Sequence, residues 1–271
     1  YTVGFAMGNY DNDGDIDVLI VRGDIGPNLL YQNNGQGVFQ DVAAAVGIAN
    51  TKNATENYRH SGPLFVDMNG DGFLDIFLGA LVDDPVKVFL NNRNGTFSDV
   101  TATSGLSNLT SKHTISAAAG DYDLDGDLDL FLTHWGTPRD IENPDASEHL
   151  WRNTSTINKI QFSDVSQASG ITTAVLSQPV VGSPLGVDHD ATFTPIFADV
   201  DNDQYPDLFV TGDFKTGRFL LNNRDGTFRN PRPELPFEDE AGMGSAVADF
   251  DNDGDLDWFV SAIGGEFWPL G

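Results

Sequence analysis

The sequence predicts an all-β fold, a β-propeller built from four-stranded blades. An acidic cluster occurs five times, a strand-like apolar stretch follows each cluster, and a motif typical of a β-hairpin comes next. Each such unit takes roughly 50 residues, a length typical of one propeller blade. We expect a single domain over residues 1–271, with repeats centred on residues 9–17, 67–75, 121–129, 199–207 and 249–257.

The acidic clusters, called acidic loops one to five in chain order, begin 58, 54, 78 and 50 residues apart. Each is followed directly by an apolar, β-rich stretch at residues 18–21, 76–78, 130–132, 208–210 and 258–260. Small and apolar residues also precede the clusters, as at 62–66 and 245–248. We therefore expect each acidic loop to connect the two strands of a hairpin.

A second motif supplies two more strands in each unit. A pair of asparagines ends an apolar stretch at 33–34, 91–92 and 222–223, and a phenylalanine follows at 39, 97 and 228. The turns between them include Asn94-Gly95 and Asp225-Gly226, dipeptides that favour tight hairpins because both residues tolerate positive φ. The segments 41–48, 99–106 and 164–171 are then expected to lead the chain to the next unit.

Extra length separates acidic loops three and four. It falls at residues 138–149 and 173–195, which we expect to be long loops on a rigid scaffold, where binding residues are often found. The triplet Asp188-His189-Asp190 lies in the second of these segments and is interpreted as part of a solvated loop, with an additional ligand contact as the alternative.

Composition restricts the function classes. The chain has 41 acidic and 14 basic residues, a formal charge of −27, which disfavours nucleic acid and anionic membrane surfaces and attracts cations. It has no cysteine, so disulfides and thiolate metal sites are excluded. No apolar run is long enough to insert into a membrane, and Tyr1 begins no signal sequence, which predicts a mature or trimmed chain.

The acidic loops offer the oxygen ligands that calcium requires. Ca²⁺ binds six to eight hard oxygens, and side chains at alternate positions of a tight loop can supply them together with one carbonyl. The expected side-chain ligands, at loop positions 1, 3, 5 and 9, are Asn9, Asp11, Asp13 and Asp17; Asp67, Asn69, Asp71 and Asp75; Asp121, Asp123, Asp125 and Asp129; Asp199, Asp201, Asp203 and Asp207; and Asp249, Asp251, Asp253 and Asp257. The expected carbonyl ligands, at position 7, belong to Asp15, Phe73, Asp127, Tyr205 and Asp255.

Two other interpretations of these loops are weaker. An EF-hand loop requires a glutamate at position 12, where this sequence has apolar residues in all five loops. Merely solvated acidic turns would leave five clusters of like charge uncompensated. About five structural calcium ions are therefore expected, and Mg²⁺ fits less well because it demands stricter octahedral geometry. Loop one begins with neutral Asn9 and loop four has Gln204 in place of glycine, so weaker binding is expected at both.

The acidic loops, with the interleaved Asn-Asn-x-x-Gly-Thr-Phe-x-Asp-Val motif at residues 91–100, resemble FG-GAP or VCBS repeats. Similar repeats occur in the propellers of integrin α subunits and in the cartilage acidic protein family. The resemblance covers nearly the whole chain and implies an extracellular β-propeller with calcium between the first two strands of each blade, used in adhesion, recognition or carbohydrate binding. Integrin-type propellers have seven blades, so the five visible repeats leave open a larger propeller.

No catalytic signature is found, and the five histidines are scattered along the chain. His60 and His113 are interpreted as residues that pack against a blade. Among the tryptophans, Trp151 is expected in the core, and Trp135 is the best candidate for an exposed ring that stacks on a sugar.

The sequence therefore predicts a non-enzymatic extracellular or cell-surface module that holds structural calcium and recognises a protein or glycan. One alternative is a carbohydrate-active enzyme, a lyase or hydrolase, because propellers often carry glycan chemistry. The other is an architectural subunit that assembles into a larger surface filament.

Overall fold

The structure is a computed structural model that describes residues 4–109, 113–138, 149–176, 189–213, 216–231 and 242–262. Two of the expected long loops fall mostly in the gaps, at 139–148 and 177–188, as does the segment after 262. The predictions made for those segments lie outside the described residues.

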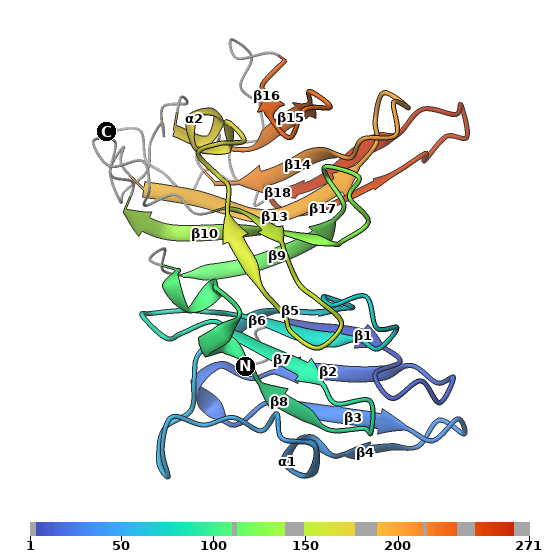
Figure 1. Cartoon of the computed structure of the whole chain (residues 1–271), viewed down its shortest axis with the longest axis vertical. Helices are drawn as coiled ribbons and strands as arrows, with labels where there is room; N and C mark the ends of the chain where they lie inside the picture. The colour runs from blue at the N-terminus through green and yellow to red at the C-terminus, as the bar shows by residue number, and fades with distance from the viewer. Residues whose placement is uncertain are drawn as a thin grey trace.

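Antiparallel strands form successive blades that follow one another in chain order, from blue to red in Figure 1. The first blade contains β1 (Gly4–Gly8), β2 (Asp17–Val21), β3 (Leu29–Asn33) and β4 (Phe39–Asp41). The second contains β5 (His60–Val66), β6 (Asp75–Ala80), β7 (Lys87–Asn91) and β8 (Phe97–Asp99).

The later blades repeat this arrangement. The third contains β9 (Thr114–Gly120), β10 (Asp129–Pro138), β11 (Leu150–Asn153) and β12 (Phe162–Asp164). The fourth contains β13 (His189–Ala198), β14 (Asp207–Gly212), β15 (Arg218–Asn222) and β16 (Phe228–Arg229). The last described strands, β17 (Gly242–Ala248) and β18 (Asp257–Ala262), form a hairpin called the fifth hairpin. The prediction of an all-β propeller with four-stranded blades is confirmed.

Helices are few and short. Those in the described residues are α1 (Ala43–Val46), α2 (Ile171–Leu176) and three 3₁₀ turns, η1 (Gly23–Ile25), η2 (Thr101–Thr103) and η3 (Leu106–Asn108). Most of them follow the fourth strand of a blade, in the segments expected to lead to the next unit. No helix among the described residues has the length and apolar composition needed to span a membrane.

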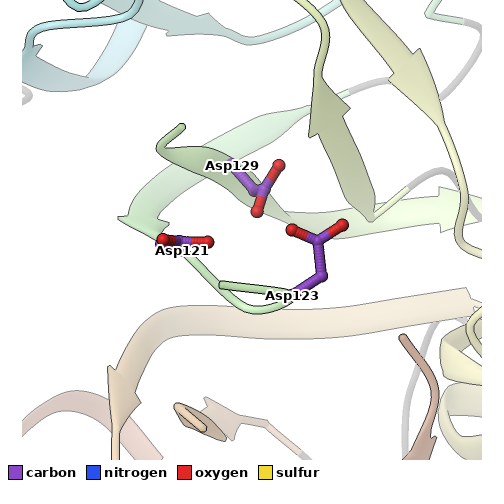
Figure 2. Close-up of side chains that lie close together, drawn as sticks. All are labelled: Asp121, Asp123 and Asp129. Carbon is purple, nitrogen blue, oxygen red and sulfur yellow. The ribbon is translucent and has the colours of Figure 1, made fainter. Parts of the chain in front are cut away.

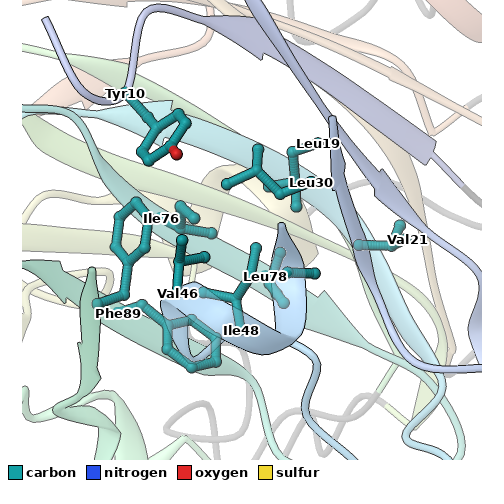
Figure 3. Close-up of a cluster of buried hydrophobic side chains, with 11 residues drawn as sticks. Tyr10, Leu19, Val21, Leu30, Val46, Ile48, Ile76, Leu78 and Phe89 are labelled. Atoms are coloured by element: carbon teal, nitrogen blue, oxygen red, sulfur yellow. The ribbon is translucent and has the colours of Figure 1, made fainter. Parts of the chain in front are cut away.

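The first strands of the blades lie side by side: β1 by β5, β5 by β9, β9 by β13 and β13 by β17. The apolar core is divided between successive blades, with one cluster of buried side chains at each of the first three junctions. Figure 3 shows the first, in which Tyr10, Leu19 and Leu30 of blade one meet Ile76 and Phe89 of blade two. Each blade is therefore stabilised mainly by the apolar surface that it buries against its neighbours.

Blades three and four are also joined by hydrogen-bonded strands, a feature that the repeat pattern did not predict. Strands β10 and β13 are each ten residues long. The carboxyl-terminal end of β10 pairs with the amino-terminal end of β13, and Trp135 lies opposite Ala191 there. The two blades consequently form one eight-stranded sheet. Trp151 is buried in the core between blades two and three, as predicted.

Candidate metal centres in the acidic loops

Each acidic loop joins the first and second strands of its blade, which confirms the hairpin prediction. The fourth and sixth residues of all five loops adopt left-handed backbone conformations, for example Asn12 at φ 59° and Gly14 at φ 101°. Gln204 takes the sixth position of loop four at φ 79°, a conformation that costs a non-glycine residue free energy. Loop four therefore keeps the common bend despite lacking the glycine.

Side-chain oxygens inside each loop accept hydrogen bonds from the loop's own backbone. The amide of the seventh residue donates to the fifth carboxylate in every loop, as from Phe73 to Asp71 Oδ1 at 2.9 Å. In four loops the first side chain accepts from the sixth amide, as Asp67 Oδ2 does from Gly72 at 2.8 Å. These bonds hold the carboxylates on the inside of the bend.

The ninth residue of each loop is an aspartate at the start of the second strand, and in blades one to four it is almost completely buried. One of its oxygens accepts the amide of the loop's second residue, and the other accepts the amide of an asparagine at the end of the third strand. In blade three, Asp129 accepts from Tyr122 at 3.3 Å and from Asn153 at 2.7 Å. This aspartate ties the loop to two strands of its own blade.

The same asparagines also join neighbouring blades. We call Asn91, Asn153 and Asn222 the clamp asparagines, because each side-chain amide donates to two carbonyls. Asn91 Nδ2 lies 2.8 Å from the carbonyl oxygen of Tyr10 in loop one and 3.0 Å from that of Leu74 in loop two. One buried side chain thus links the acidic loops of two successive blades.

Three of the loops bring carboxylate oxygens together within 4.8 Å of one another. They are formed by Asp121, Asp123 and Asp129; by Asp199, Asp201 and Asp203; and by Asp249, Asp251 and Asp257. Figure 2 shows the first group, with Asp129 on β10 and the other two carboxylates in the preceding loop. In loops one and two, Asn9 or Asn69 replaces one of the acids, and no such group of three carboxylates forms among the described residues.

Burial and mutual repulsion perturb these acids. Desolvation raises the pKa of Asp75 and of Asp129 to about 7 in each case, and neighbouring loop carboxylates act in the same direction. Desolvation likewise raises the pKa of Asp17, Asp123 and Asp207. Without a cation, each of these loops holds negative charge at a cost in free energy.

Arginines partly compensate this charge in three blades. Arg93 Nε lies 2.8 Å from Asp71 Oδ2, Arg152 lies 2.9 Å from both Asp123 and Asp125, and Arg224 pairs with Asp203. Burial acts to raise the pKa of Asp71, but hydrogen bonds from Arg93 and from the loop backbone outweigh it, so the pKa is lowered. These counter-ions were not identified from the sequence; Arg93 and Arg224 follow the third strands of their blades, and Arg152 lies within one.

The residues of loop three fit a bound cation. Asp121 Oδ1 and Asp123 Oδ1 are buried and have no hydrogen-bond partner within the described part of the chain. Buried carboxylate oxygens are normally satisfied, because burying charge without a partner is costly. An all-oxygen set of carboxylates and carbonyls suits a hard divalent ion such as Ca²⁺.

The structure corrects two predictions outside the acidic loops. Trp135 is half-buried rather than exposed, and its Nε1–H donates to Asp213 Oδ2 at 2.9 Å. Asp190 was expected in a solvated loop, but it is buried with one carboxylate oxygen 2.9 Å from His149 Nε2. His60 is buried, as predicted, and desolvation lowers its pKa to about 4.

A concave pocket with a volume of about 510 Å³ lies at the end of blade two away from its acidic loop. Lys87, Asp99, Thr101 and His113 contribute polar groups to its lining, and Leu106 contributes apolar surface. The Lys87 ammonium lies 2.8 Å from Asp99 Oδ2. This combination of polar and apolar surface is typical of sites that bind small polar molecules.

Comparison with known proteins gives a consistent family assignment. A family model described as an FG-GAP-like repeat matches residues 9–78, 67–132 and 199–260. Cartilage acidic protein 1 of Homo sapiens is 27% identical over 275 residues, covering 96% of this chain and 35% of that protein. The protein of the same name from Mus musculus is 27% identical over 261 residues, covering 88% of this chain and 34% of its own length. The chain thus spans about a third of these relatives.

Among solved structures, one of an Agrocybe aegerita lectin, described as specifically recognising non-reducing terminal N-acetylglucosamine, matches with a TM-score of 0.48 and 18% identity. The match covers 94% of this chain and 59% of the lectin chain.

Proposed function

This chain belongs to the family of FG-GAP-like repeat proteins, and we propose that it is an extracellular calcium-binding propeller that recognises a protein or glycan ligand. The metal has a structural role in this proposal. The observation that supports it most strongly is in loop three, where three carboxylates converge and two buried oxygens have no hydrogen-bond partner within the described residues.

Calcium is the ion that this chemistry favours. The loops offer carboxylates, amide oxygens and backbone carbonyls, which are the ligands of Ca²⁺ in flexible coordination spheres. In the proposal, the side chains at positions 1, 3, 5 and 9 and the carbonyl at position 7 hold the ion in each loop. The formal charge of −27 also raises the local concentration of cations around the chain.

Calcium would stabilise the blades rather than react with a substrate. The bound ion neutralises carboxylates that burial otherwise disfavours in the charged form, as the raised pKa values of Asp75 and Asp129 indicate. A ligand that binds only the folded state stabilises it by about 2.7 kcal/mol per site at a free concentration 100 times its Kd. The proposed extracellular location would supply calcium continuously. This location is consistent with the matched relatives, which are named for cartilage.

The pocket on blade two is the best candidate in the described structure for contact with a small polar group of the ligand. Lys87, Asp99 and Thr101 can donate and accept hydrogen bonds there, beside the apolar side chain of Leu106. This arrangement suits a hydroxyl-rich ligand or a polar peptide segment. If the alternative of a carbohydrate-active enzyme holds, substitutions at these residues abolish turnover of a polysaccharide; in the binding proposal they reduce affinity alone.

Thermal unfolding with calcium chloride and with excess chelator tests the proposal, together with metal analysis of the purified protein. We expect several calcium ions per chain and a fall of many degrees in Tm on chelation. An unchanged Tm and no bound metal would contradict the calcium proposal. A glycan array with the calcium-loaded protein then tests recognition, and the variant Lys87→Ala provides the matched control.

A further inference from the structure

The turn between β11 and β12 in blade three is longer than the equivalent turns of the other blades. It has eight residues, 154–161, whereas the turns between the third and fourth strands of blades one, two and four have five each, at 34–38, 92–96 and 223–227. Backbone hydrogen bonds in both directions between Thr156 and Lys159 close the tip of the longer turn around Ile157 and Asn158.

The tip of this turn lies against acidic loop two of the preceding blade. The Ile157 carbonyl oxygen accepts a hydrogen bond from Asn69 Nδ2 at 3.0 Å and another from Arg93 Nη2 at 2.8 Å. Arg93 also pairs with Asp71 through Nε, at 2.8 Å. Asn69 is only 6% exposed, and the side chain of Asp71 is 1% exposed. The turn of blade three thus contacts the proposed calcium site of blade two.

Loop two has a neutral residue where the other four loops have an acid. Asn69 is its third residue, and the third residues of loops one, three, four and five are Asp11, Asp123, Asp201 and Asp251. An aspartate presents an oxygen whichever way its carboxylate is turned, whereas an asparagine can bind a cation only through Oδ1. The orientation of the Asn69 amide therefore decides whether loop two offers a complete set of oxygen ligands.

Three hydrogen bonds fix that orientation. Asn69 Nδ2 donates to Asp71 Oδ2 as well as to the Ile157 carbonyl, each at 3.0 Å. Asn69 Oδ1 accepts the backbone amide of Asp71 at 3.3 Å, as Asp11 Oδ1 and Asp251 Oδ1 accept the equivalent amides of their loops at 3.3 and 3.2 Å. The reversed amide would set Oδ1 against two acceptors and Nδ2 against a donor. The Ile157 carbonyl is the one of these partners that comes from another blade.

We propose that the turn at 154–161 is a positioning element for the calcium site of loop two. Its Ile157 carbonyl holds Asn69 Nδ2, which keeps Asn69 Oδ1 in the place that a carboxylate oxygen takes in other loops. The inference rests on the proposed calcium binding and adds that a neighbouring blade sets the affinity of one loop. Removing a hydrogen-bond partner that orients a metal ligand typically weakens metal binding about ten- to a hundredfold.

Exchanging the turn tests the proposal. In the turn-exchange variant, residues 154–161 are replaced by Asn-Arg-Asp-Gly-Thr, the shorter turn of blade four. The NMR signals of ¹⁵N-labelled Gly70 and Gly72 report the occupancy of loop two while a chelator buffer sets the free calcium concentration. We expect their midpoint to move to about ten- to a hundredfold more calcium, with Gly254 of loop five unaffected. Asn158→Ala is the matched control, because it changes an exposed side chain of the turn and keeps the carbonyl of residue 157.

The substitution Asn69→Asp separates positioning from a general loosening of blade three. In the turn-exchange variant it should recover about tenfold in calcium affinity, because a carboxylate needs no partner to turn an oxygen inward. With the natural turn in place it should gain far less, since the second carboxylate oxygen then faces the Ile157 carbonyl. A loosened blade three would gain the same from the substitution with either turn.

Hydrogen exchange of the Asn69 side-chain amide tests the unaltered chain, and slow exchange is expected in calcium. Rapid exchange there, or an unchanged loop two midpoint in the turn-exchange variant, would overturn the positioning role. So would a wild-type chain in which calcium shifts Gly14, Gly126 and Gly254 of the other loops but not Gly70. If calcium shifts none of these signals, the calcium proposal itself fails.

Discussion

Acidic loops three and five have nearly the same sequence but different surroundings. Both place an aspartate at every proposed side-chain ligand position, both have glycine at the sixth position, and both bring three carboxylates together. Asp129 in loop three is fully buried and accepts two backbone amides, whereas Asp257 in loop five is partly exposed and accepts only that of Phe250 among the described residues.

The difference separates two contributions to a metal site. The bend and the inward-facing carboxylates arise within nine residues and are therefore alike in both loops. Burial of the ninth aspartate depends on the third strand of the same blade and on contact with the next blade. Packing between blades thus determines how strongly desolvation acts on a loop that the local sequence has already shaped.

Replacing the ninth aspartate should expose this difference most strongly. In excess chelator, where loss of a proposed calcium ligand does not contribute, Asp129→Ala is expected to lower the free energy of unfolding by about 3–5 kcal/mol, because it leaves the buried amides of Tyr122 and Asn153 without acceptors. Asp257→Ala should cost less than about 1 kcal/mol, because the amide of Phe250 that loses its acceptor lies in an exposed position and can donate to water instead. Urea unfolding of both variants measures the difference, and equal losses would show that burial is not what distinguishes the two loops.

Substitution of a clamp asparagine should have the next largest effect. Asn91→Ala removes the amide shared by the carbonyls of Tyr10 and Leu74, so we expect a loss of about 2–3 kcal/mol. Asn33→Ala is the matched control and should cost less than about 1 kcal/mol, since its side-chain amide donates to Ile16 alone among the described residues. A similar loss in the two variants would contradict the role of Asn91 between blades.

Burial between blades also predicts a pH dependence through His60. Its pKa in the folded chain, about 4, lies below the usual value of 6.5 because of desolvation and then the nearby Lys87 charge. As the pH falls, His60 is therefore protonated in the unfolded chain before it is protonated in the folded chain. The stability present above pH 6.5 is lost as the pH falls toward 4. At pH 5 the expected loss is about 2 kcal/mol.

The variant His60→Asn isolates this contribution from the many carboxylates. Unfolding free energies of wild type and variant are measured between about pH 7.5 and 5. The wild-type curve should fall more steeply than that of the variant over this range, and parallel curves would show that His60 does not contribute.

The smallest effect is expected at the arginine counter-ions. Arg152 is 45% exposed in its side chain, so its pairs with Asp123 and Asp125 should contribute no more than about 1 kcal/mol. Arg152→Gln should slightly destabilise the calcium-free chain and tighten calcium binding a few-fold at low salt, an effect that added salt reduces. Calorimetric titration measures it, and weaker binding in the variant would mean that the arginine supports the site.

Several features of the fold could be predicted because they depend on residues close together in the chain. The acidic loops, the Asn-Gly and Asp-Gly turns and the alternation of strands all arise within one unit. The double role of Asn91, the pairing of Arg152 with loop three and the burial of Asp190 against His149 could not, since each depends on a residue from another strand or blade.

The sequence by itself determined the all-β propeller class, the five bends and the placement of carboxylates inside them, because local hydrogen bonds and left-handed residues fix those features. Only the tertiary structure decided which carboxylates are buried, which amides clamp two blades together and which turn contacts the acidic loop of a neighbouring blade. Those properties come from the packing of one blade on the next, where desolvation and long-range contacts act between residues far apart in the chain.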